Sequence, residues 1–348
     1  RPGSTTAKAG SGSQPRSFTS IGWAEDVKAI RVNEFGDPDV LELQEVEDPV
    51  PGPDQTLIEV ETAGVNFGDL LVRRGEYFGR KGLPVIPGWE VVGSALSPDP
   101  DGNFKAGDRV VALLDGKGYA RLVAAPTADV AAVPDGVSDQ VALAMVIQGA
   151  TAWRLLDSME PGDRILVSGA GSGVTHLVVQ LARQRGAAEC FVIASSEEKA
   201  RRVEALGADQ AVRLDGQEPV GEQLAGVLEG GKVDLVIDMV GGEMLLGMLR
   251  QLRPGGRAVI YGVAGGTPAK VSTGALLKNG ISISGLWLGH PGSIALREVL
   301  GELFRLHLEG RLNPTLGPVF PLAEAAEAHR AVEARTGVGK VALDCRPG

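Results

Sequence analysis

The stretch that most constrains the fold of this chain runs from Arg164 to Gly186, RILVSGAGSGVTHLVVQLARQRG. It begins with the apolar run of a buried strand, passes through a loop containing Gly169, Gly171 and Gly173, and continues with the apolar spacing of a helix. Glycines let the backbone approach a phosphate closely, and a helix N-terminus offers it free N–H groups. The stretch therefore predicts the start of a dinucleotide-binding fold, with a purely structural turn as the alternative.

Two residues depart from the usual G-x-G-x-x-G spacing of such a loop. Thr175 and His176 stand where a small residue normally lets the helix lie close to the sheet, so we expect the helix to be displaced slightly outward. We expect His176 to be a packed or a solvent-edge residue rather than a catalytic one, because nothing nearby in the sequence orients it. The phosphate-facing positions come earlier in the loop, and the residues expected to contact the pyrophosphate are Gly171, Ser172, Gly173 and Val174.

The rest of the 348 residues separates into two patterns, which predict two domains. Residues 149–288 alternate strand runs with helical runs, as in a parallel, doubly wound sheet, and we expect a helix over 242–255 that ends at its Pro-Gly pair. Residues 27–148 contain many short strands punctuated by Gly and Pro, which predicts a β-rich unit such as a twisted barrel. Residues 1–26 are expected to be a tag remnant or a disordered leader.

Composition excludes several classes of partner. The formal net charge of −10 argues against nucleic acid and anionic membranes, and no apolar run is long enough to span a bilayer. Cys190 and Cys345 lie far apart in apolar surroundings and are expected to be buried free thiols, as suits a reducing cytoplasm. The four histidines show no metal-ligand spacing, so we expect no metal site. These features predict a soluble cytoplasmic protein with a small-molecule partner.

The end of the strand after the glycine loop bears on the choice of cofactor. A site that prefers NAD places Asp or Glu there to accept hydrogen bonds from the ribose hydroxyls. This chain has Ser195, followed in the next turn by Lys199, Arg201 and Arg202, and a neutral strand end with cations beside it favours the 2′-phosphate of NADPH. The alternative is a solvated helix start, in which Glu197 and Glu198 suit the helix dipole and Lys199 pairs with them.

Several short motifs follow one another along nearly the whole chain: AGVNFGD, PVIPGWEVVG, FKAGDRVVAL, GATAW, VDLVIDMVGG, LRPGGRAVIYG and GVGKVALD. Together they resemble the medium-chain dehydrogenase/reductase superfamily. The resemblance implies an α/β fold class, with a GroES-like β-barrel catalytic domain formed by residues 27–148 and 289–348. It also implies a Rossmann doubly wound parallel sheet over residues 149–288.

Within the superfamily the chain is more similar to the zinc-free quinone oxidoreductases and enoyl reductases than to the zinc alcohol dehydrogenases. Asn66 and Trp89 stand where the zinc enzymes carry Cys and His ligands. The resemblance places Asn66 beside the nicotinamide, and Tyr77 matches the tyrosine proposed as the acid in mitochondrial-type enoyl thioester reductases. A tyrosine O–H can stabilise an enolate or supply its α-proton. The alternative is that Tyr77 packs on the barrel and water supplies the proton.

The resemblance also suggests three further cofactor contacts and an assembly. Thr151, Tyr261 and Lys340 are expected to contact the dinucleotide, although a strand-end aromatic such as Tyr261 also suits a core. Residues 280–288 are expected to form the edge strand of a homodimer. Leu71 stands where quinone reductases often have a tyrosine, which changes the expected substrate pocket.

These observations predict an NADPH-dependent reductase that transfers hydride to an activated C=C bond, in an enone or an enoyl thioester, without a metal. A substrate carried on a partner protein is compatible with this prediction. The first alternative is an NADPH:quinone oxidoreductase. The second, from another class, is a dinucleotide-binding protein without turnover.

Overall fold

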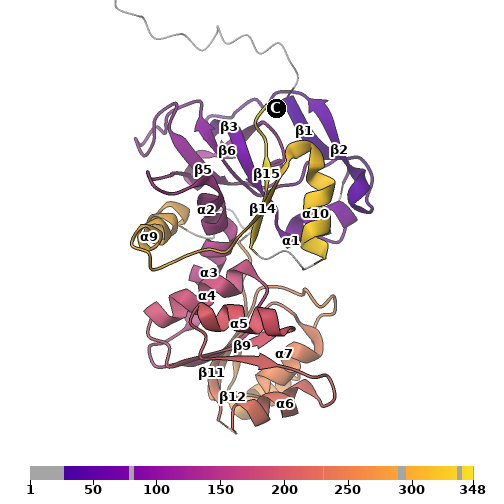
Figure 1. Cartoon of the computed structure of the whole chain (residues 1–348), viewed down its shortest axis with the longest axis vertical. Coiled ribbons are helices and arrows are strands. Elements are labelled where there is room, and N and C mark those ends of the chain that lie inside the picture. The colour runs from indigo at the N-terminus through magenta and orange to yellow at the C-terminus, as the bar shows by residue number, and fades with distance from the viewer. Residues whose placement is uncertain (1–26, 78–81, 230, 289–294, 335–338, 348) are drawn as a thin grey trace, which may run out of the picture.

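The computed structural model describes residues 27–77, 82–229, 231–288, 295–334 and 339–347. Figure 1 shows two lobes stacked along the long axis, an upper β-rich lobe and a lower lobe in which helices cover a sheet. The expected leader over 1–26 lies outside the described residues. In the described part of the chain, no helix has both the length and the apolar character needed to cross a membrane.

The lower lobe contains a six-stranded sheet with the order β10-β9-β8-β11-β12-β13, and every pair of neighbours is parallel. This confirms the predicted doubly wound sheet. Its strands are β8 (Arg164–Ser168), β9 (Glu189–Ala194), β10 (Gln210–Arg213), β11 (Val233–Asp238), β12 (Leu252–Ile260) and β13 (Ser282–Gly285). Its helices are α4 (Gly173–Gln184), α5 (Glu197–Ala205), α6 (Val220–Val227), α7 (Gly242–Leu249) and α8 (Thr273–Asn279).

The order of the strands reverses between β8 and β11. From β8 the chain proceeds toward one edge of the sheet through β9 and β10, and from β11 it proceeds toward the other edge through β12 and β13. In open parallel sheets the carboxyl ends of the strands at such a reversal form the ligand crevice. The glycine loop after β8 lies at this point, so the fold places it where a dinucleotide binds.

The prediction of a helix over 242–255 is wrong for the second half of that range. Helix α7 ends at Leu249, and β12 begins at Leu252 and runs through Pro254. The pairing with β11 skips from Leu252 to Arg257, so the residues between them leave the ladder. A proline is tolerated at such a bulge, because it has no N–H to donate to the ladder.

The upper lobe contains a seven-stranded sheet with the order β14-β15-β3-β4-β5-β7, in which β6 also pairs with β3, and a separate pair, β1-β2. Its strands are β1 (Val27–Val32), β2 (Leu41–Val46), β3 (Gln55–Gly64), β4 (Glu90–Ala95), β5 (Arg109–Leu113), β6 (Leu122–Pro126), β7 (Val130–Ala132), β14 (Leu316–Pro321) and β15 (Lys340–Asp344). Helices α1 (Phe67–Arg74) and α10 (Ala325–Glu333) pack on each other in this lobe. The architecture confirms the expected GroES-like sheet beside a Rossmann-like sheet.

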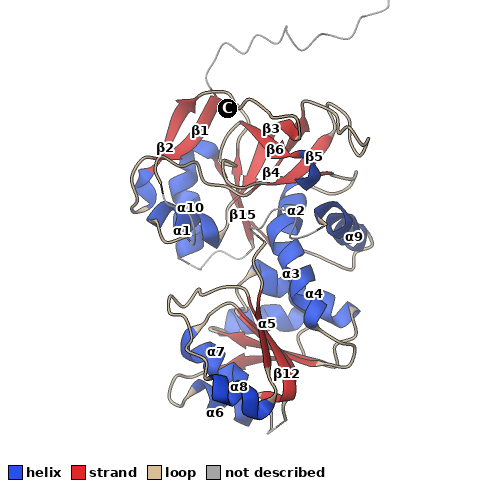
Figure 2. Cartoon of the chain, turned by 180° about the vertical axis from the view of Figure 1, so that it is seen from behind, coloured by secondary structure: helices blue, strands red, loops and turns tan. Residues whose placement is uncertain are grey.

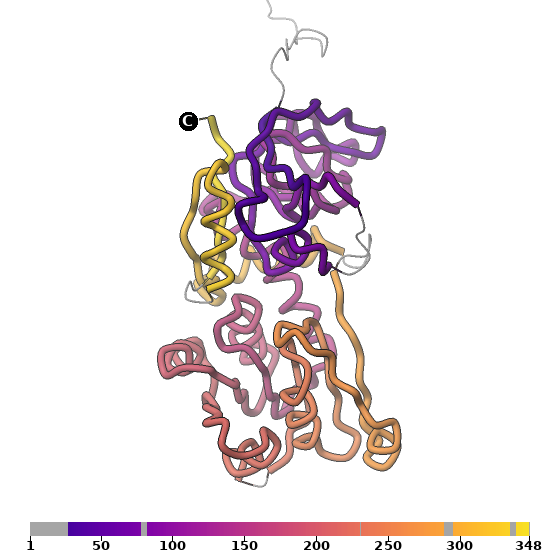
Figure 3. Tube along the Cα trace, turned by 90° about the vertical axis from the view of Figure 1, so that its right-hand side faces the viewer, coloured from indigo at the N-terminus to yellow at the C-terminus, as the bar shows by residue number. Residues whose placement is uncertain are grey.

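The lobes are joined by a continuous helical segment and a shared core. Helix α2 (Asp139–Ala144) continues through a π-helical turn, η4 (Met145–Gly149), into α3 (Ala150–Leu155), and Figure 2 shows this segment passing from the upper to the lower lobe. Helix α9 (Leu296–Leu308) packs against η4. One buried cluster includes Val111 of β5 and Val167 of β8, so the hydrophobic core is continuous across the junction. Figure 3 shows the chain from α8 through β13 rising along one side toward the upper lobe.

Candidate active site

Asn66 lies at the junction between the two lobes, immediately before α1. Its backbone is extended (φ −125°, ψ 159°), and its N–H donates to Asp69 Oδ2 at 2.8 Å. Asp69 Oδ1 in turn accepts the N–H of Gly88 at 2.8 Å. The fully buried Asp69 carboxyl therefore fixes the main chain at Asn66 and ties it to the start of β4.

The Asn66 side chain belongs to a buried polar cluster with Glu90 and Lys340. Lys340 Nζ donates to Asn66 Oδ1 at 2.8 Å and to the carbonyl oxygen of Val65 at 3.3 Å, and it forms an ion pair with Glu90 Oε1. Asn66 Nδ2 donates to the same Glu90 oxygen at 3.0 Å. The Lys340 and Glu90 side chains are both fully buried. The cluster joins three segments that are distant in the sequence, β15, β4 and the start of α1.

The second oxygen of Glu90 reaches the helical segment between the lobes. Glu90 Oε2 accepts the N–H of Ile147 at 2.9 Å, within the π-helical turn η4. The next residue, Gln148, places its side-chain amide directly over the α-carbon of Gly173, where a Cβ would collide with it. The π-turn therefore connects the Asn66 cluster with the glycine loop, and single π-turns are frequent at functional sites.

Tyr77 lies among aromatic side chains from both lobes. Its ring centroid is 5.0 Å from that of Trp89 and 6.5 Å from that of Trp287. The Trp287 Nε1–H donates to Tyr77 Oη at 2.9 Å. Trp287 follows β13 in the lower lobe and is 47% exposed, so Tyr77 faces the space between the lobes rather than the barrel interior alone.

The glycine loop turns sharply from β8 into the capped start of α4. Gly169 has φ 84°, a left-handed conformation that favours glycine, and Ser172 caps α4 by accepting the N–H of Val174 at 3.2 Å. Thr175 is fully buried, and its hydroxyl donates to the carbonyl oxygen of Ser168 at 3.1 Å. This hydrogen bond joins the helix directly to the end of β8; the outward displacement of α4 stays a prediction.

His176 is a packed residue, as expected. Its side chain is fully buried, Nε2 lies 2.9 Å from the carbonyl oxygen of Ala170, and Nδ1 lies 2.9 Å from Thr315 Oγ1. Burial lowers its pKa. The ring therefore ties the glycine loop to the segment that precedes β14, with both nitrogens occupied.

The residues predicted to bind a 2′-phosphate lie near the end of β9. Lys199 Nζ lies 3.3 Å from Ser195 Oγ, and the Lys199 stem lies against Gly171. Neighbouring cations are held by acids of the same helix: Arg201 pairs with Glu197 at 3.1 Å. The structure thus brings Gly171, Ser195 and Lys199 together, with the ammonium beside the neutral strand end.

Of two further predicted cofactor residues, Tyr261 lies near the loop. The Tyr261 hydroxyl is buried without a hydrogen bond of good geometry; burial raises the pKa of Tyr261 to about 12, and the hydroxyls of Thr175 and Ser172 act in the opposite direction. Thr151 is a largely buried residue in the first turn of α3. Tyr261 therefore approaches the loop, and for both residues contact with a dinucleotide stays a prediction.

The Asp69 carboxyl has an unusual protonation equilibrium. Burial raises its pKa to about 7, although the N–H groups of Asn66 and Gly88 and the charge of Lys340 act in the opposite direction. A carboxyl that changes charge near neutral pH therefore lies directly behind the candidate site residue Asn66.

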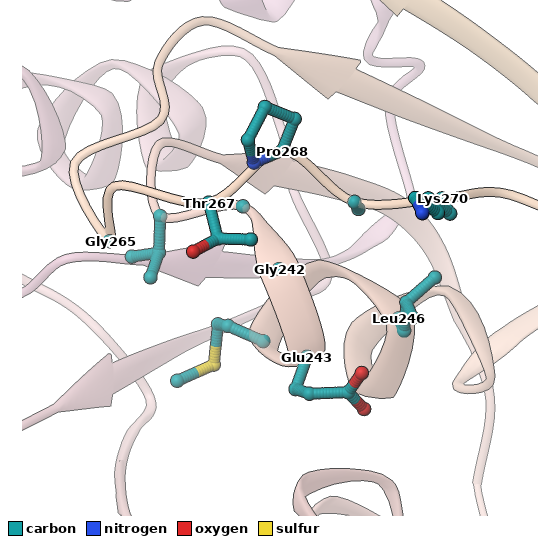
Figure 4. A pocket seen from close by; sticks show the side chains of 11 residues that line it. Gly242, Glu243, Leu246, Gly265, Thr267, Pro268 and Lys270 are labelled. Carbon is teal, nitrogen blue, oxygen red and sulfur yellow. The ribbon is translucent and has the colours of Figure 1, made fainter.

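A separate cavity of about 500 Å³ lies beyond the carboxyl ends of β11 and β12. Figure 4 shows it between the start of α7, at Gly242 and Glu243, and the segment that carries Gly265, Thr267 and Lys270. None of the residues predicted to bind the cofactor or to act in catalysis lines it. The cavity is therefore distinct from the site built around Asn66 and the glycine loop.

The two cysteine thiols have a clear outcome. Cys190 and Cys345 are buried free thiols, as expected, and burial raises the pKa of each to about 12. Among the described residues, no group of three or more His, Cys, Asp and Glu side chains is arranged to hold a metal ion.

Glu90, Ile147 and Trp287 were not identified from the sequence. Ile147 contributes a backbone N–H, and Trp287 reaches Tyr77 across 210 positions of sequence, so no local pattern marks either. Glu90 did leave a signal: it is an acid at the start of the apolar strand WEVVG. A buried acid requires a partner, and Lys340 at the start of KVAL is a matching base.

Comparisons with known proteins agree with this architecture. The family model of the alcohol dehydrogenase GroES-like domain matches residues 52–137, and that of the zinc-binding dehydrogenase matches residues 173–305. A probable quinone oxidoreductase of Schizosaccharomyces pombe is 33% identical over 328 residues, which cover 91% of this chain and 96% of that protein.

Two further relatives differ in kind. The structure of the quinone oxidoreductase from Thermus thermophilus, solved also in complex with NADPH, superposes with a TM-score of 0.78 at 32% identity over 91% of this chain and 99% of that one. A mycocerosic acid synthase-like polyketide synthase of Mycobacterium tuberculosis is 29% identical over 344 residues, which are 95% of this chain but 16% of that protein. With its two matched domains and full-length relatives, this chain belongs to the zinc-free medium-chain dehydrogenase/reductase superfamily, in its quinone oxidoreductase branch.

Proposed function

We propose that this protein is an NADPH-dependent reductase that adds hydride to an activated C=C bond of a conjugated carbonyl compound. One observation carries the proposal: a single π-turn connects the glycine loop, through Gln148, with the Asn66 cluster, through Ile147 and Glu90. A dinucleotide whose pyrophosphate lies on the loop would then extend its reactive end toward Asn66, between the lobes.

The residues at the carboxyl edge of the sheet fit NADPH. The start of α4 supplies N–H groups for a pyrophosphate. Lys199 beside Ser195 suits a 2′-phosphate, and no acid occupies the strand end to compete for it. The NADPH complex of the Thermus relative supports the same assignment. When bound, NADPH would supply a hydride and become NADP⁺, and a proton from a side chain or solvent would complete the saturated product.

In this proposal Asn66 and Tyr77 act on the carbonyl side of the substrate. As hydride reaches the β-carbon, the π-electron pair moves toward the carbonyl oxygen, where negative charge develops. The Asn66 Nδ2–H stabilises that oxygen as a hydrogen-bond donor. The Tyr77 O–H delivers the α-proton and is reprotonated from solvent. The Trp287 N–H bond to Tyr77 Oη stabilises the phenolate that forms during this transfer.

Quinone reduction is the second candidate, because the Schizosaccharomyces pombe relative is named as a probable quinone oxidoreductase. A quinone takes up one hydride and one proton to give the hydroquinone, with the new charge again on an oxygen atom. This reaction needs an oxygen-directed donor such as Asn66 but no proton delivered to carbon. The two candidates therefore differ in their dependence on Tyr77.

A substrate panel tests the proposal. Oxidation of NADPH and of NADH is followed by absorbance with 2-cyclohexen-1-one, an enoyl thioester and 1,4-benzoquinone, and products are identified by mass spectrometry. The proposal predicts a saturated ketone or thioester and a preference for NADPH. Hydroquinone as the only product selects the second candidate. Binding of NADPH, seen as a fluorescence change, without turnover on any acceptor indicates a dinucleotide-binding protein without catalysis.

A further inference from the structure

We propose that the buried Glu90–Lys340 ion pair is a positioning pair, which fixes the side-chain amide of Asn66 so that it presents only a hydrogen-bond donor to the substrate. The inference rests on the proposed function for the identity of the reaction. Its geometric part, the locked amide, stands on the contacts within this chain.

The hydrogen bonds of the cluster leave the amide one orientation. An asparagine amide carries an acceptor oxygen and two N–H groups, and a flip of the amide exchanges their places. Lys340 Nζ is a donor only and occupies Oδ1, whereas the Glu90 carboxylate is an acceptor and occupies one Nδ2–H. In a flipped amide, the Asn66 N–H groups would face the Lys340 ammonium and the Asn66 oxygen would face the Glu90 carboxylate. Neither contact is a hydrogen bond, so the pair selects a single orientation of the Asn66 amide.

These hydrogen bonds also determine which group of Asn66 is available to a ligand. Its oxygen is committed to Lys340 and one of its N–H groups to Glu90. The second N–H has no acceptor among the residues that the structure describes, and the Asn66 side chain is half-buried. The group that Asn66 meets in a ligand must therefore be an acceptor, which a carbonyl or enolate oxygen is.

The pair is itself held in place from several sides. The three donors of Lys340 Nζ are taken by Glu90, by Asn66 and by the carbonyl oxygen of Val65. Glu90 Oε2 accepts the N–H of Ile147. Gly64 leaves room for the Glu90 carboxylate, since a Cβ there would overlap Oε1. An ion pair with so many satisfied bonds is rigid, and burying two charges for stability alone is rarely advantageous.

The cluster also links the amide to the cofactor loop. Ile147 is bound by Glu90, and its neighbour Gln148 lies against Gly173. The contact passes through one π-turn, so the position of the loop and the orientation of Asn66 depend on the same backbone. This connection explains why a charged pair is placed at the junction of the lobes rather than within the barrel.

The test uses the full-length protein and a variant without an unpaired buried charge. The double substitution Glu90→Gln/Lys340→Met removes both charges together, because removing one would leave the other uncompensated. It is compared with Lys340→Arg, which keeps the charge and the donors, and with Asn66→Ala, alone and combined with the double substitution. Thermal unfolding and the NADPH dissociation constant report on folding and on the cofactor site.

The first readout needs no turnover. The side-chain amide protons of Asn66, assigned by their loss in Asn66→Ala, are observed by NMR without ligand. We expect one of them to be protected from exchange with water in the wild type, and this protection to be lost in the double variant and kept in Lys340→Arg. Equal protection in the wild type and the double variant would overturn the locked amide.

The second readout is kinetic, with 2-cyclohexen-1-one and 1,4-benzoquinone as acceptors. We expect kcat of the double variant to fall by at least about tenfold, with the KM for NADPH changed by less than about threefold, as for loss of a transition-state interaction. The triple variant should be no slower than Asn66→Ala, because the pair acts through that residue. A double variant with wild-type kcat contradicts positioning, whereas wild-type kcat in Asn66→Ala refutes the role of Asn66 in the proposed function.

Discussion

Tyr77 is the residue whose role depends most on its surroundings. Its ring packs on Trp89, and its hydroxyl accepts the indole N–H of Trp287, which comes from the other lobe. The ring contact belongs to the fold, whereas the hydroxyl is assigned to proton transfer in the proposed function. A substitution that keeps the ring and removes the hydroxyl separates these two contributions.

For Tyr77→Phe we expect kcat for enone reduction to fall by roughly 100-fold, the scale typical of losing a general acid. Quinone reduction should change by less than about threefold, because that reaction needs no proton on carbon. Steady-state kinetics with both acceptors checks this, and Trp89→Phe serves as a control for the ring contact. An enone rate equal to that of the wild type would assign the proton to water.

In the proposed function, Lys199 distinguishes the two nicotinamide cofactors. Its ammonium lies beside Ser195, whereas Arg201, two residues later, is paired with Glu197. For Lys199→Ala we expect the KM for NADPH to rise by about tenfold, with the KM for NADH unchanged, because a charge-assisted bond to phosphate is lost. Arg201→Ala is the matched control. Parallel increases for both cofactors would place Lys199 outside the 2′-phosphate site.

At this scale the sequence predicted which residue types matter but not how they are held. Asn66 and Lys340 were both identified, yet their direct contact joins positions 274 residues apart. Thr175 looked like a defect in the glycine loop, but its hydroxyl bonds to Ser168 and so has a partner inside the fold. Such contacts are set by tertiary packing, and no local spacing encodes them.

Among the elements, α1 shows most clearly how a buried acid shapes the site. Asp69, in its first turn, binds the N–H groups of Asn66 and Gly88, and burial raises its pKa to about 7 from 3.8. The folded state binds the Asp69 proton more tightly than the unfolded chain does. The protonated Asp69 carboxyl therefore adds to the free energy of unfolding in full below about pH 4, and this addition is lost as the pH rises through 7.

We therefore expect Asp69→Asn to change the pH dependence of stability. Relative to this variant, the free energy of unfolding of the wild type should fall by on the order of 3 kcal/mol between about pH 4 and pH 8. Urea unfolding across that range measures the difference. Parallel pH profiles for the two proteins would show that the Asp69 carboxyl titrates normally in the folded state.

Helices and strands with a strong hydrophobic period were predicted well, whereas an element interrupted by Pro and Gly was not. The glycine loop between β8 and α4 and the alternation that follows it are strong signals. The Pro-Gly pair at 254–255 is typical of a helix end, but the chain forms β12 there and bulges out around the proline. The π-turn η4 has no sequence signature, because it depends on Glu90 accepting the N–H of Ile147.

For the whole molecule, the free edge of the lower sheet predicts an assembly. Among the described strands, β13 pairs only with β12, and Leu277 on the neighbouring α8 is 85% exposed. An unpaired edge beside an exposed apolar side chain favours pairing with a second copy. We expect light scattering to give twice the chain mass of 36.1 kDa, and Ser282→Lys at this edge to give the single mass. A wild-type protein that stays at the single mass at all concentrations contradicts this assembly.

The two lobes and their shared core organise the site as a whole. The lower lobe supplies the glycine loop, Lys199 and Trp287, and the upper lobe supplies Asn66 and Tyr77, while one helical segment passes between them. The resemblance in sequence predicted this division, and the comparisons confirmed the family. Which compound accepts the hydride is decided by experiment.

The most direct measurement follows the hydride itself. NADPH carrying deuterium at the transferable position of nicotinamide C4 is incubated with the protein and 2-cyclohexen-1-one, and the ketone is analysed by mass spectrometry and NMR. We predict one deuterium atom at the β-carbon of the saturated ketone. Oxidation of the cofactor without deuterium in the product, or no oxidation with any acceptor of the panel, would contradict hydride transfer to an activated C=C bond.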